Sequence, residues 1–432
     1  VWESSGHNFF MRKMNYAADK IFKALALLLV AGLGSLAADD WPQWRGPNRD
    51  GISKETGLLK EWPANGPRLV WKAAGLGGGY STVAVVGERI YTTGDRADAN
   101  YLVALNRADG KILWSAKLGG KAGAPGWGGF AGPRATPTVD GDLVFAVDQW
   151  GEMACFNAGD GKELWRKNFT TDFGGARPEW GFSESPLVDG DRVMVTPGGP
   201  KGAIVALDKK TGAMIWQSRE FTDAAHYSSL ILVNWGGVRQ VIQLTADSVA
   251  GVAVADGKLL WRAVRKGRTA VIPTPIFDSG LVYVTSGYGV GCNLFKVTEA
   301  GGKFSVEQLY ENKVMQNHHG GAIKIGDYVY GHSDGRGWTC QDFKTGEVKW
   351  QEKSKLGKGS LVFADGRFYL RQEDKQGTVA LIEASPEGYK ELGRFDQPDR
   401  SSKNSWPHPV VAGGRLYLRD QDILLCYDVK QP

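Results

Sequence analysis

Four of the six histidines in this 432-residue chain fall in one set of positions that also holds an arginine, a lysine and a glutamate. The set comes from aligning internal repeats, described below. Its basic side chains can bind anions, and its aromatic side chains offer flat apolar walls. A concave pocket with this lining can hold a planar polyanion, a sugar or a peptide segment. The candidate binding residues are Tyr80, Arg134, Glu184, His226, Tyr227, His318, His319, Lys358, Trp406 and His408.

Metal binding at this set depends on Glu184, its one carboxylate. Calcium prefers carboxylate oxygens, so Glu184 is the candidate metal ligand. A calcium site usually draws on several oxygens, however, and the aligned positions supply no second acid. The adjacent pair His318 and His319 can bind one metal together only from a loop, because neighbouring side chains on a strand point to opposite faces. The alternative interpretation is a water-filled funnel whose polar lining is merely solvated.

Other catalytic patterns are absent from the sequence. The glycine-rich runs at 75–80 and 289–292 do not sit between a strand and a helix, so they are not nucleotide-binding loops. No nucleophile-elbow pattern and no CxxC pair occur. The four cysteines are too scattered to suggest a disulfide or zinc framework, and we expect them to be buried and free. The sequence therefore indicates binding more than catalysis.

The elements that position these residues are built from one repeated unit. The clearest copies are ALNRADGKILW (104–114), CFNAGDGKELW (155–165), ALDKKTGAMIW (206–216), GVAVADGKLLW (251–261) and CQDFKTGEVKW (340–350). Each predicts a strand, a tight turn at the glycine and a second strand that ends on tryptophan. The glycine supplies the positive φ of the turn, and the indole is suited to packing between neighbouring sheets. Five copies with fixed internal spacing indicate a repeat architecture.

Counting the repeats predicts an all-β, eight-bladed β-propeller of four-stranded antiparallel blades. Degenerate copies end near Tyr310 and Phe395, and the last copy, from Cys426, stops before its turn. An isolated strand at about 69–73 has no unit before it, so we expect it to close the ring as the outer strand of the last blade. The predicted structural repeat residues are Trp71, Trp114, Trp165, Trp216, Trp261 and Trp350.

In a propeller, the innermost strand of each blade lines the central funnel, so a ligand would bind where these strands begin. Aligning the eight copies places one residue of each blade in a ring: Tyr80, Arg134, Ser183, Tyr227, Ile272, His319, Gly359 and Trp406. The other candidates lie one or two residues away. Residues 41–68, rich in Trp, Pro and Gly, are expected to cross one face of the ring.

The N-terminus has the character of an export signal. Basic residues between Arg12 and Lys23 precede the apolar run 24–33, and small residues follow at 35–38. We therefore predict that residues 1–38 are an N-terminal extension and cleaved secretory signal peptide, and that 39–432 form a single domain. The protein is expected to be periplasmic or secreted, without a lipobox cysteine, without a transmembrane segment after cleavage, and monomeric. A net charge of only +5 gives no indication of a nucleic-acid partner.

The repeat A-x-D-x-x-T-G-x-x-x-W resembles that of the pyrroloquinoline quinone (PQQ) repeat family. The family includes quinoprotein dehydrogenases and non-catalytic relatives such as the outer-membrane assembly protein BamB. The opening from Asp40 to Gly51, DWPQWRGPNRDG, also resembles exported bacterial PQQ-like proteins of unassigned function. The resemblance covers essentially the whole mature chain. It implies the propeller fold, but the repeat itself is structural and does not imply an activity.

Two functions are compatible with this resemblance. The favoured one is an exported, non-enzymatic binding or scaffold module that takes a protein or glycan partner of the cell envelope through its funnel face, with no cofactor. The alternative is a PQQ-dependent oxidoreductase acting on an alcohol or sugar, with Glu184 on calcium and Arg134 or Lys358 on the quinone carboxylates. The chain lacks the adjacent cysteine pair of the alcohol dehydrogenase type and any CxxCH haem motif, and both departures favour the first function.

Overall fold

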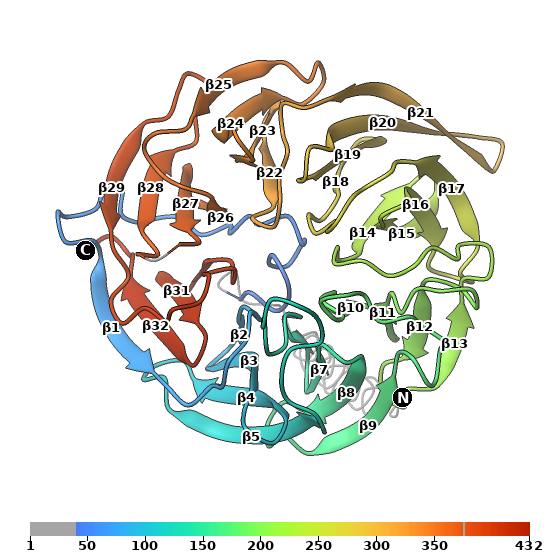
Figure 1. Ribbon diagram of the computed structural model, residues 1–432, viewed down its shortest axis with the longest axis horizontal. Coiled ribbons are helices and arrows are strands. Elements are labelled where there is room, and N and C mark those ends of the chain that lie inside the picture. The colour runs from blue at the N-terminus through green and yellow to red at the C-terminus, as the bar shows by residue number, and fades with distance from the viewer. Residues whose placement is uncertain (1–39, 375) are drawn as a thin grey trace, which may run out of the picture. The chain divides into compact units, whose positions relative to one another are not determined.

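The computed structural model describes residues 40–374 and 376–432, where every regular element is a β-strand. Residues 40–432 belong to one compact unit, and its strands form eight four-stranded antiparallel sheets arranged as the blades of a propeller (Figure 1). The predicted fold class is therefore confirmed. Within this part of the chain, no helix is long and apolar enough to cross a membrane. The predicted signal peptide lies outside the described residues and stays a prediction.

Seven blades are built from four consecutive strands, the first strand lying innermost. Blade 1 contains β2(Ala84–Val86), β3(Arg89–Asp95), β4(Asn100–Asn106) and β5(Ile112–Gly119), and blade 2 contains β6(Thr138–Asp140), β7(Leu143–Val147), β8(Glu152–Asn157) and β9(Glu163–Asn168). Blade 3 contains β10(Leu187–Asp189), β11(Arg192–Val195), β12(Val205–Asp208) and β13(Met214–Gln217). Blade 4 contains β14(Ile231–Trp235), β15(Val238–Leu244), β16(Ser248–Ala253) and β17(Leu259–Val264). Blades 5 to 7 are β18(Ile276–Asp278), β19(Leu281–Ser286), β20(Gly291–Ala300), β21(Lys303–Asn312); β22(Ala322–Ile325), β23(Tyr328–Ser333), β24(Gly337–Asp342), β25(Val348–Glu352); and β26(Gly359–Ala364), β27(Arg367–Gln372), β28(Val379–Glu383), β29(Glu391–Phe395).

The eighth blade joins the two ends of the described chain. It contains β30(Val410–Ala412), β31(Arg415–Asp420) and β32(Ile423–Asp428), and β1(Arg68–Ala73) pairs antiparallel with β32 as its outer strand. In this register Arg68 lies opposite Asp428, and the two side chains form an ion pair at 2.7 Å. The predicted closure of the ring by the N-terminal strand is therefore confirmed.

The turn glycine and the tryptophan of the repeat meet across the seam between blades. Gly110, Gly161 and Gly212 have φ values of 72°, 75° and 70°, in the left-handed region that favours glycine. A Cβ atom on Gly110 would lie 2.6 Å from the ring of Trp71, which belongs to the neighbouring blade. The Nε1 atom of Trp71 donates a hydrogen bond to the carbonyl of Arg107 in the same turn, at 3.2 Å. Trp114, Trp165, Trp216 and Trp350 repeat this hydrogen bond in their own seams.

The degenerate repeats keep the same contact with other side chains. Tyr310 ends its unit in β21, and its hydroxyl donates to the carbonyl of Phe343 in blade 6 at 2.9 Å. Phe395 ends β29 and packs on Gly66, where a Cβ atom would lie 2.6 Å from it. Trp261 differs from the other repeat tryptophans, because its Nε1 atom donates to Gln240 of its own blade. Apart from Trp261, these aromatic side chains thus share a contact with a turn of the neighbouring blade.

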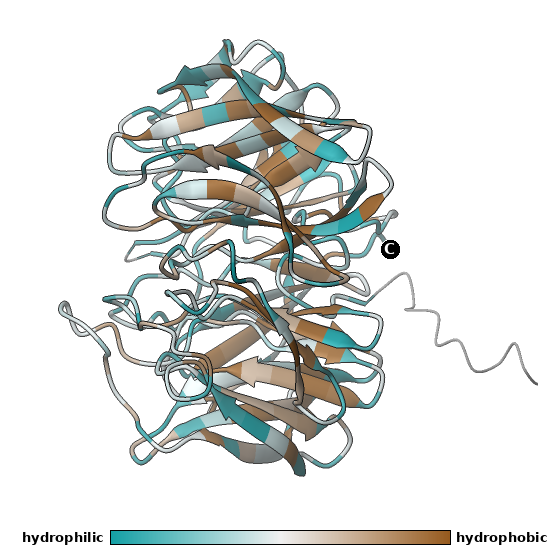
Figure 2. Ribbon diagram, turned by 90° about the vertical axis from the view of Figure 1, so that its right-hand side faces the viewer, coloured by the Kyte–Doolittle hydropathy of each residue, from teal (hydrophilic) through white to brown (hydrophobic). Residues whose placement is uncertain are grey.

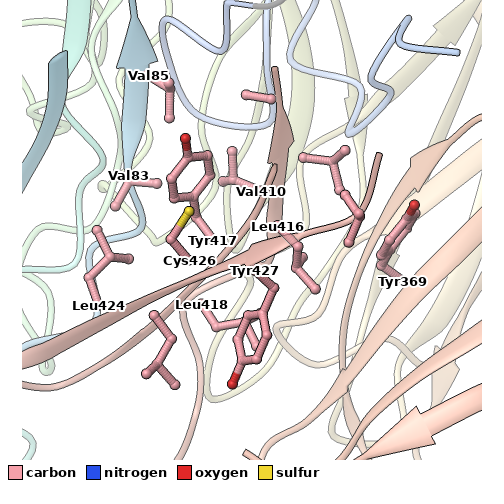
Figure 3. Close-up of a cluster of buried hydrophobic side chains, with 14 of the residues drawn as sticks. Val83, Val85, Tyr369, Val410, Leu416, Tyr417, Leu418, Leu424, Cys426 and Tyr427 are labelled. Atoms are coloured by element: carbon pink, nitrogen blue, oxygen red, sulfur yellow. The ribbon is translucent and has the colours of Figure 1, made fainter. Parts of the chain in front are cut away.

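Hydrophobic clusters fill the spaces between the blades. The largest joins blades 7, 8 and 1, and Figure 3 shows Tyr369, Tyr417, Tyr427 and several aliphatic side chains converging there. Seen from the side, apolar stretches run through the strands, and many connecting turns are hydrophilic (Figure 2). Seven separate clusters among the described residues lie between neighbouring blades, so every blade buries apolar surface on both of its neighbours.

A central segment, residues 41–55, contacts seven of the eight blades. Figure 1 shows it in blue, crossing the middle of the ring. Backbone hydrogen bonds join it to the innermost strands of blades 1, 2 and 7, at Trp41–Val85, Pro42–Val139 and Ser53–Phe363. Side chains reach the others: Trp44 to Thr274 in blade 5, Arg45 to Ala322 in blade 6, Arg49 to Ser185 in blade 3, and Glu55 to Gly413 and Gly414 in blade 8. The segment predicted to cross a face of the ring therefore enters its channel.

Candidate functional site

A cavity of about 320 Å³ lies at the centre of the ring, lined mainly by residues that precede the innermost strands of the blades. We call it the funnel cavity. Seven of the eight aligned ring positions line it: Tyr80, Arg134, Ser183, Tyr227, Ile272, His319 and Trp406. His318 and His408 line it as well, whereas Gly359 does not. The structure therefore brings together seven of the ten candidate binding residues in the wall of one cavity: Tyr80, Arg134, Tyr227, His318, His319, Trp406 and His408.

Glu184 lies next to the cavity in sequence but points away from it. Ser183 lines the cavity, and consecutive side chains of an extended chain face opposite sides. Glu184 is 3% exposed and accepts hydrogen bonds from Thr196 and from the backbone N–H of Leu230. Burial raises the pKa of Glu184 to about 7, although the nearby charge of Arg49 acts to lower it. Its carboxylate thus links two blades inside the fold.

His226 and Lys358 also lie outside the cavity lining. The Nδ1 atom of His226 accepts a hydrogen bond from the backbone N–H of Val271 at 3.0 Å, and burial lowers the pKa of this imidazole. The Nζ atom of Lys358 contacts Nδ1 of His318 and lies 3.8 Å from Glu373. His226 therefore fixes the backbone at Val271 next to the cavity, and Lys358 fixes the lining residue His318.

Glu373 is a functional candidate that the repeat alignment missed. Its Oε2 atom lies 2.6 Å from Nε2 of His319 and accepts a hydrogen bond from Nε1 of Trp406 at 2.8 Å. The aligned ring positions hold no second acid, as expected from the sequence, but Glu373 lies beside them and was not among the residues compared. Glu373 follows β27, outside the innermost strands that the alignment compared. Its chemical role here is to fix the orientation of two cavity side chains.

The ion pairing of Glu373 gives a pH-dependent contribution to stability. Burial alone would raise the pKa of Glu373, but the hydrogen bond from His319 and the charge of Lys358 lower it to about 2. A carboxyl with a depressed pKa stabilises the fold above its unfolded value of 4.5, and this contribution is lost as pH falls toward 2. Between neutral pH and pH 2, the free energy of unfolding of the native protein should fall by on the order of 3 kcal/mol through this group. We expect this part of the fall to be absent in Glu373→Gln. Urea unfolding of both proteins at pH 2.5, 4 and 6 tests this. If the free energy of unfolding changes equally with pH in the two proteins, the prediction is contradicted.

His318 connects Lys358 to Tyr288 on the cavity wall through two hydrogen bonds. An ammonium group can only donate, so Nδ1 of His318 accepts from Lys358. Burial, together with the charges of His319 and Lys358, lowers the pKa of His318 to about 3, so its ring is neutral and Nε2 carries the proton. Nε2 then donates to the hydroxyl oxygen of Tyr288, 2.9 Å away. The hydroxyl proton of Tyr288 is left for another acceptor.

Arg134 is the cation of the cavity wall. Its Nη1 and Nη2 atoms donate to the backbone carbonyls of Gly132 and Phe130, the second at 2.6 Å. Among the described residues it forms no ion pair with a carboxylate, and its guanidinium lies 5.7 Å from the ring of Tyr80. Burial lowers the pKa of Arg134 to about 10, so it remains charged at neutral pH. A guanidinium without a counter-charge in an apolar cavity is suited to a ligand anion.

Loops and the central segment supply aromatic walls that the alignment did not include. Trp127 and Phe130 come from the loop after β5, Trp180 from the loop after β9, and Trp44 from the central segment. Trp127 is 67% exposed, and its ring lies edge-on to Trp180 with centroids 5.3 Å apart. These positions fall outside the repeat unit, so no repeat spacing marks them. The one feature of the sequence that could have pointed to these loops is their high content of aromatic residues.

The described residues do not fit calcium-bound PQQ. Glu184, the proposed calcium ligand, faces the blade interior, and Glu373 is held by His319 and Trp406. No group of three or more His, Cys, Asp or Glu side chains that could hold a metal ion occurs among the described residues. The aromatic walls suit a planar ring, but the cation that accompanies the quinone has no ligand set.

Comparison with known proteins identifies the repeat. The sequence model described as "Outer membrane protein assembly factor BamB" matches residues 56–149 and 121–352, more than half of the chain. BamB of Alkalilimnicola ehrlichii is 25% identical over 211 residues, which cover 49% of this chain and 50% of that protein. The chain thus spans about half the length of this curated relative.

Solved structures share the fold at low identity. BamB from Moraxella catarrhalis superposes with a TM-score of 0.59 at 15% identity, covering 84% of this chain and 98% of that one. Quinohemoprotein alcohol dehydrogenase from Comamonas testosteroni gives a TM-score of 0.60 at 11% identity, covering 94% and 82%. At this identity the likeness concerns the fold alone. Together with the family match, the repeats show that the chain belongs to the PQQ-like β-propeller family of BamB.

Proposed function

We propose that this chain is an exported, non-enzymatic binding module that takes a protein or glycan partner of the cell envelope through its funnel face. The observation that carries the proposal is the funnel cavity itself. Its walls are mainly aromatic, its histidines are fixed by neighbours, and its one uncompensated charge belongs to Arg134. Such a lining binds by shape and by a few placed polar groups.

The family supports a binding role over a catalytic one. The matching family model and the relative from Alkalilimnicola ehrlichii both carry the name outer membrane protein assembly factor. An assembly factor works by contact with other envelope components, which fits an exported scaffold. Among the described residues, neither histidine here is paired with a nucleophile, because Nε2 of His319 is engaged with Glu373 and Nε2 of His408 donates to the backbone carbonyl of His319.

The test uses the exposed indole at the mouth of the cavity. Residues 39–432 are immobilised and incubated with solubilised envelope fractions, and bound protein and glycan are quantified. We expect Trp127→Ala to lower capture at least fivefold, because Trp127 is 67% exposed beside the cavity. Met214→Ala is the control, since Met214 is similarly exposed, at 57%, on the outer strand β13. Equal capture by the two variants would contradict a role for the funnel face.

A parallel titration addresses the oxidoreductase alternative. PQQ is added to the same protein with and without calcium, and heat of binding is measured. We expect no calcium-dependent saturable binding, because the described carboxylates near the cavity are engaged in the fold. Tight binding that requires calcium and is lost in Glu184→Ala would reverse the assignment and favour a quinoprotein.

A further inference from the structure

The funnel cavity combines an apolar lining with one charge that the protein does not neutralise. Among the described residues, the Arg134 guanidinium donates to the carbonyls of Gly132 and Phe130, which leaves further N–H groups available to a ligand. Asp95 is the one carboxylate whose charge acts on Arg134 appreciably, and among the described residues the two form no ion pair. A carboxylate is the anion that a guanidinium binds through two parallel hydrogen bonds. The ligand expected at this end of the cavity therefore carries a carboxylate.

The aromatic side chains form a fixed platform beside Arg134. The ring of Trp406 lies 4.7 Å from Tyr80 and 4.9 Å from Phe130 between centroids. Its Nε1 atom is held by Glu373 at 2.8 Å, so the indole cannot turn freely. Aromatic faces carry negative charge density, which attracts the electropositive C–H groups on one face of a pyranose ring. A fixed platform of this kind suits a sugar ring.

Tyr288 adds a directed donor on another wall. Because His318 donates to its oxygen, the hydroxyl of Tyr288 can present its own proton to a ligand oxygen. Arg134, Tyr227 and Tyr288 all line the funnel cavity, so both donors face the same enclosed space. A sugar has hydroxyl oxygens around its ring that can accept such a hydrogen bond. A purely apolar ligand would leave this donor unpaired.

We propose that the funnel cavity binds an acidic sugar, a pyranose ring bearing a carboxylate, as part of an envelope glycan. Arg134 binds the carboxylate, the Trp406 platform packs against the ring, and Tyr288 donates to a hydroxyl. The cavity volume of about 320 Å³ has room for one or two rings, at the low end of the range of roughly 300–1,000 Å³ for small-ligand sites. The inference rests on the proposed binding function and names its ligand class.

The experiment compares uronate oligosaccharides of two or three units with the same oligosaccharides after chemical reduction of their carboxyl groups. Binding to residues 39–432 is measured by calorimetry and by tryptophan fluorescence. We expect the acidic form to bind at least tenfold more tightly than its reduced counterpart. Arg134→Gln is expected to abolish that difference, and Tyr288→Phe to weaken the acidic form three- to tenfold. Arg219→Gln, at an exposed arginine outside the cavity, is the matched control and is expected to change nothing.

Two results would overturn the inference. Equal binding of the acidic and reduced sugars would show that Arg134 does not recognise a carboxylate. Absence of binding by both would show that the ligand is not a sugar of this kind. A short peptide with an aromatic residue and a free terminal carboxylate is the comparison ligand. If it binds and the sugars do not, the ligand class is wrong while the binding function stands. If Trp127→Ala also leaves capture from envelope fractions unchanged, the proposed function fails together with it.

Discussion

Replacing Arg419 with methionine is expected to lower the free energy of unfolding by about 4 kcal/mol. Arg419 is 1% exposed and lies in β31, at the junction between the last and the first blade. Its guanidinium donates to the carbonyl of Thr93 in β3 of blade 1 and to those of Gly77 and Ser81, which precede β2. Methionine keeps an unbranched apolar stem but has no donor, so these buried carbonyls would lose their partners. Each unpaired carbonyl costs about 1–3 kcal/mol.

The Arg419 experiment is urea unfolding followed by tryptophan fluorescence. Arg219→Met is the control, because Arg219 is exposed on the surface. Arg419→Lys is expected to give an intermediate loss, since an ammonium retains the charge but cannot match the fork of a guanidinium. A loss below about 1 kcal/mol, the scale of a single ordinary hydrogen bond, would show that the closing junction does not depend on this side chain.

The second large effect is expected at the central segment. Arg45 is 4% exposed, and its Nη2 atom donates to the carbonyls of Ala322 at 2.6 Å and Asp50 at 3.0 Å. Burial lowers its pKa to about 10, so the cation remains charged in the channel of the propeller. We expect Arg45→Ala to cost about 3 kcal/mol of unfolding free energy, because it frees two carbonyls and leaves a void.

Hydrogen exchange separates this effect from a local one. The central segment pairs with innermost strands in blades 1, 2 and 7, so loosening it is expected to lower amide protection at Val85, Val139 and Phe363 as well as near Ala322. Arg219→Ala serves as the control for a surface arginine. Loss of protection confined to Ala322 would contradict the view that the segment holds the blades together as a unit.

Sequence reasoning predicted the fold well because the repeat carries its own geometry. The turn glycine and the terminal tryptophan meet across each seam, so their spacing encodes both the hairpin and the packing of the next blade. The unit ending at Tyr310 could still be counted without its tryptophan, because a tyrosine makes the same contact. The central segment lacked a periodic pattern, and its contacts depend on isolated side chains such as Arg45 and Arg49.

The site was predicted less completely, for reasons of local geometry. The alignment located the start of each innermost strand but not the direction of each side chain. In blades 3 and 4 consecutive side chains face opposite sides, so Ser183 and Tyr227 line the cavity whereas Glu184 and His226 do not. In blade 6 the consecutive residues His318 and His319 both line it. Glu373 and Tyr288 come from other loops, which no repeat marker places. Long-range packing therefore determined the residues that the spacing could not.

The pairing of β1 with β32 has a consequence for how the chain is made. Arg68 and Asp428, which pair at its end, are 360 residues apart. At about 5–20 residues per second, synthesis of the intervening chain takes roughly 20–70 s. During that time β1 has no partner, and an unpaired edge strand is a place where another chain can add. Arrival of the C-terminal strand is thus the event that turns an open arc of blades into a ring without a free edge at this joint.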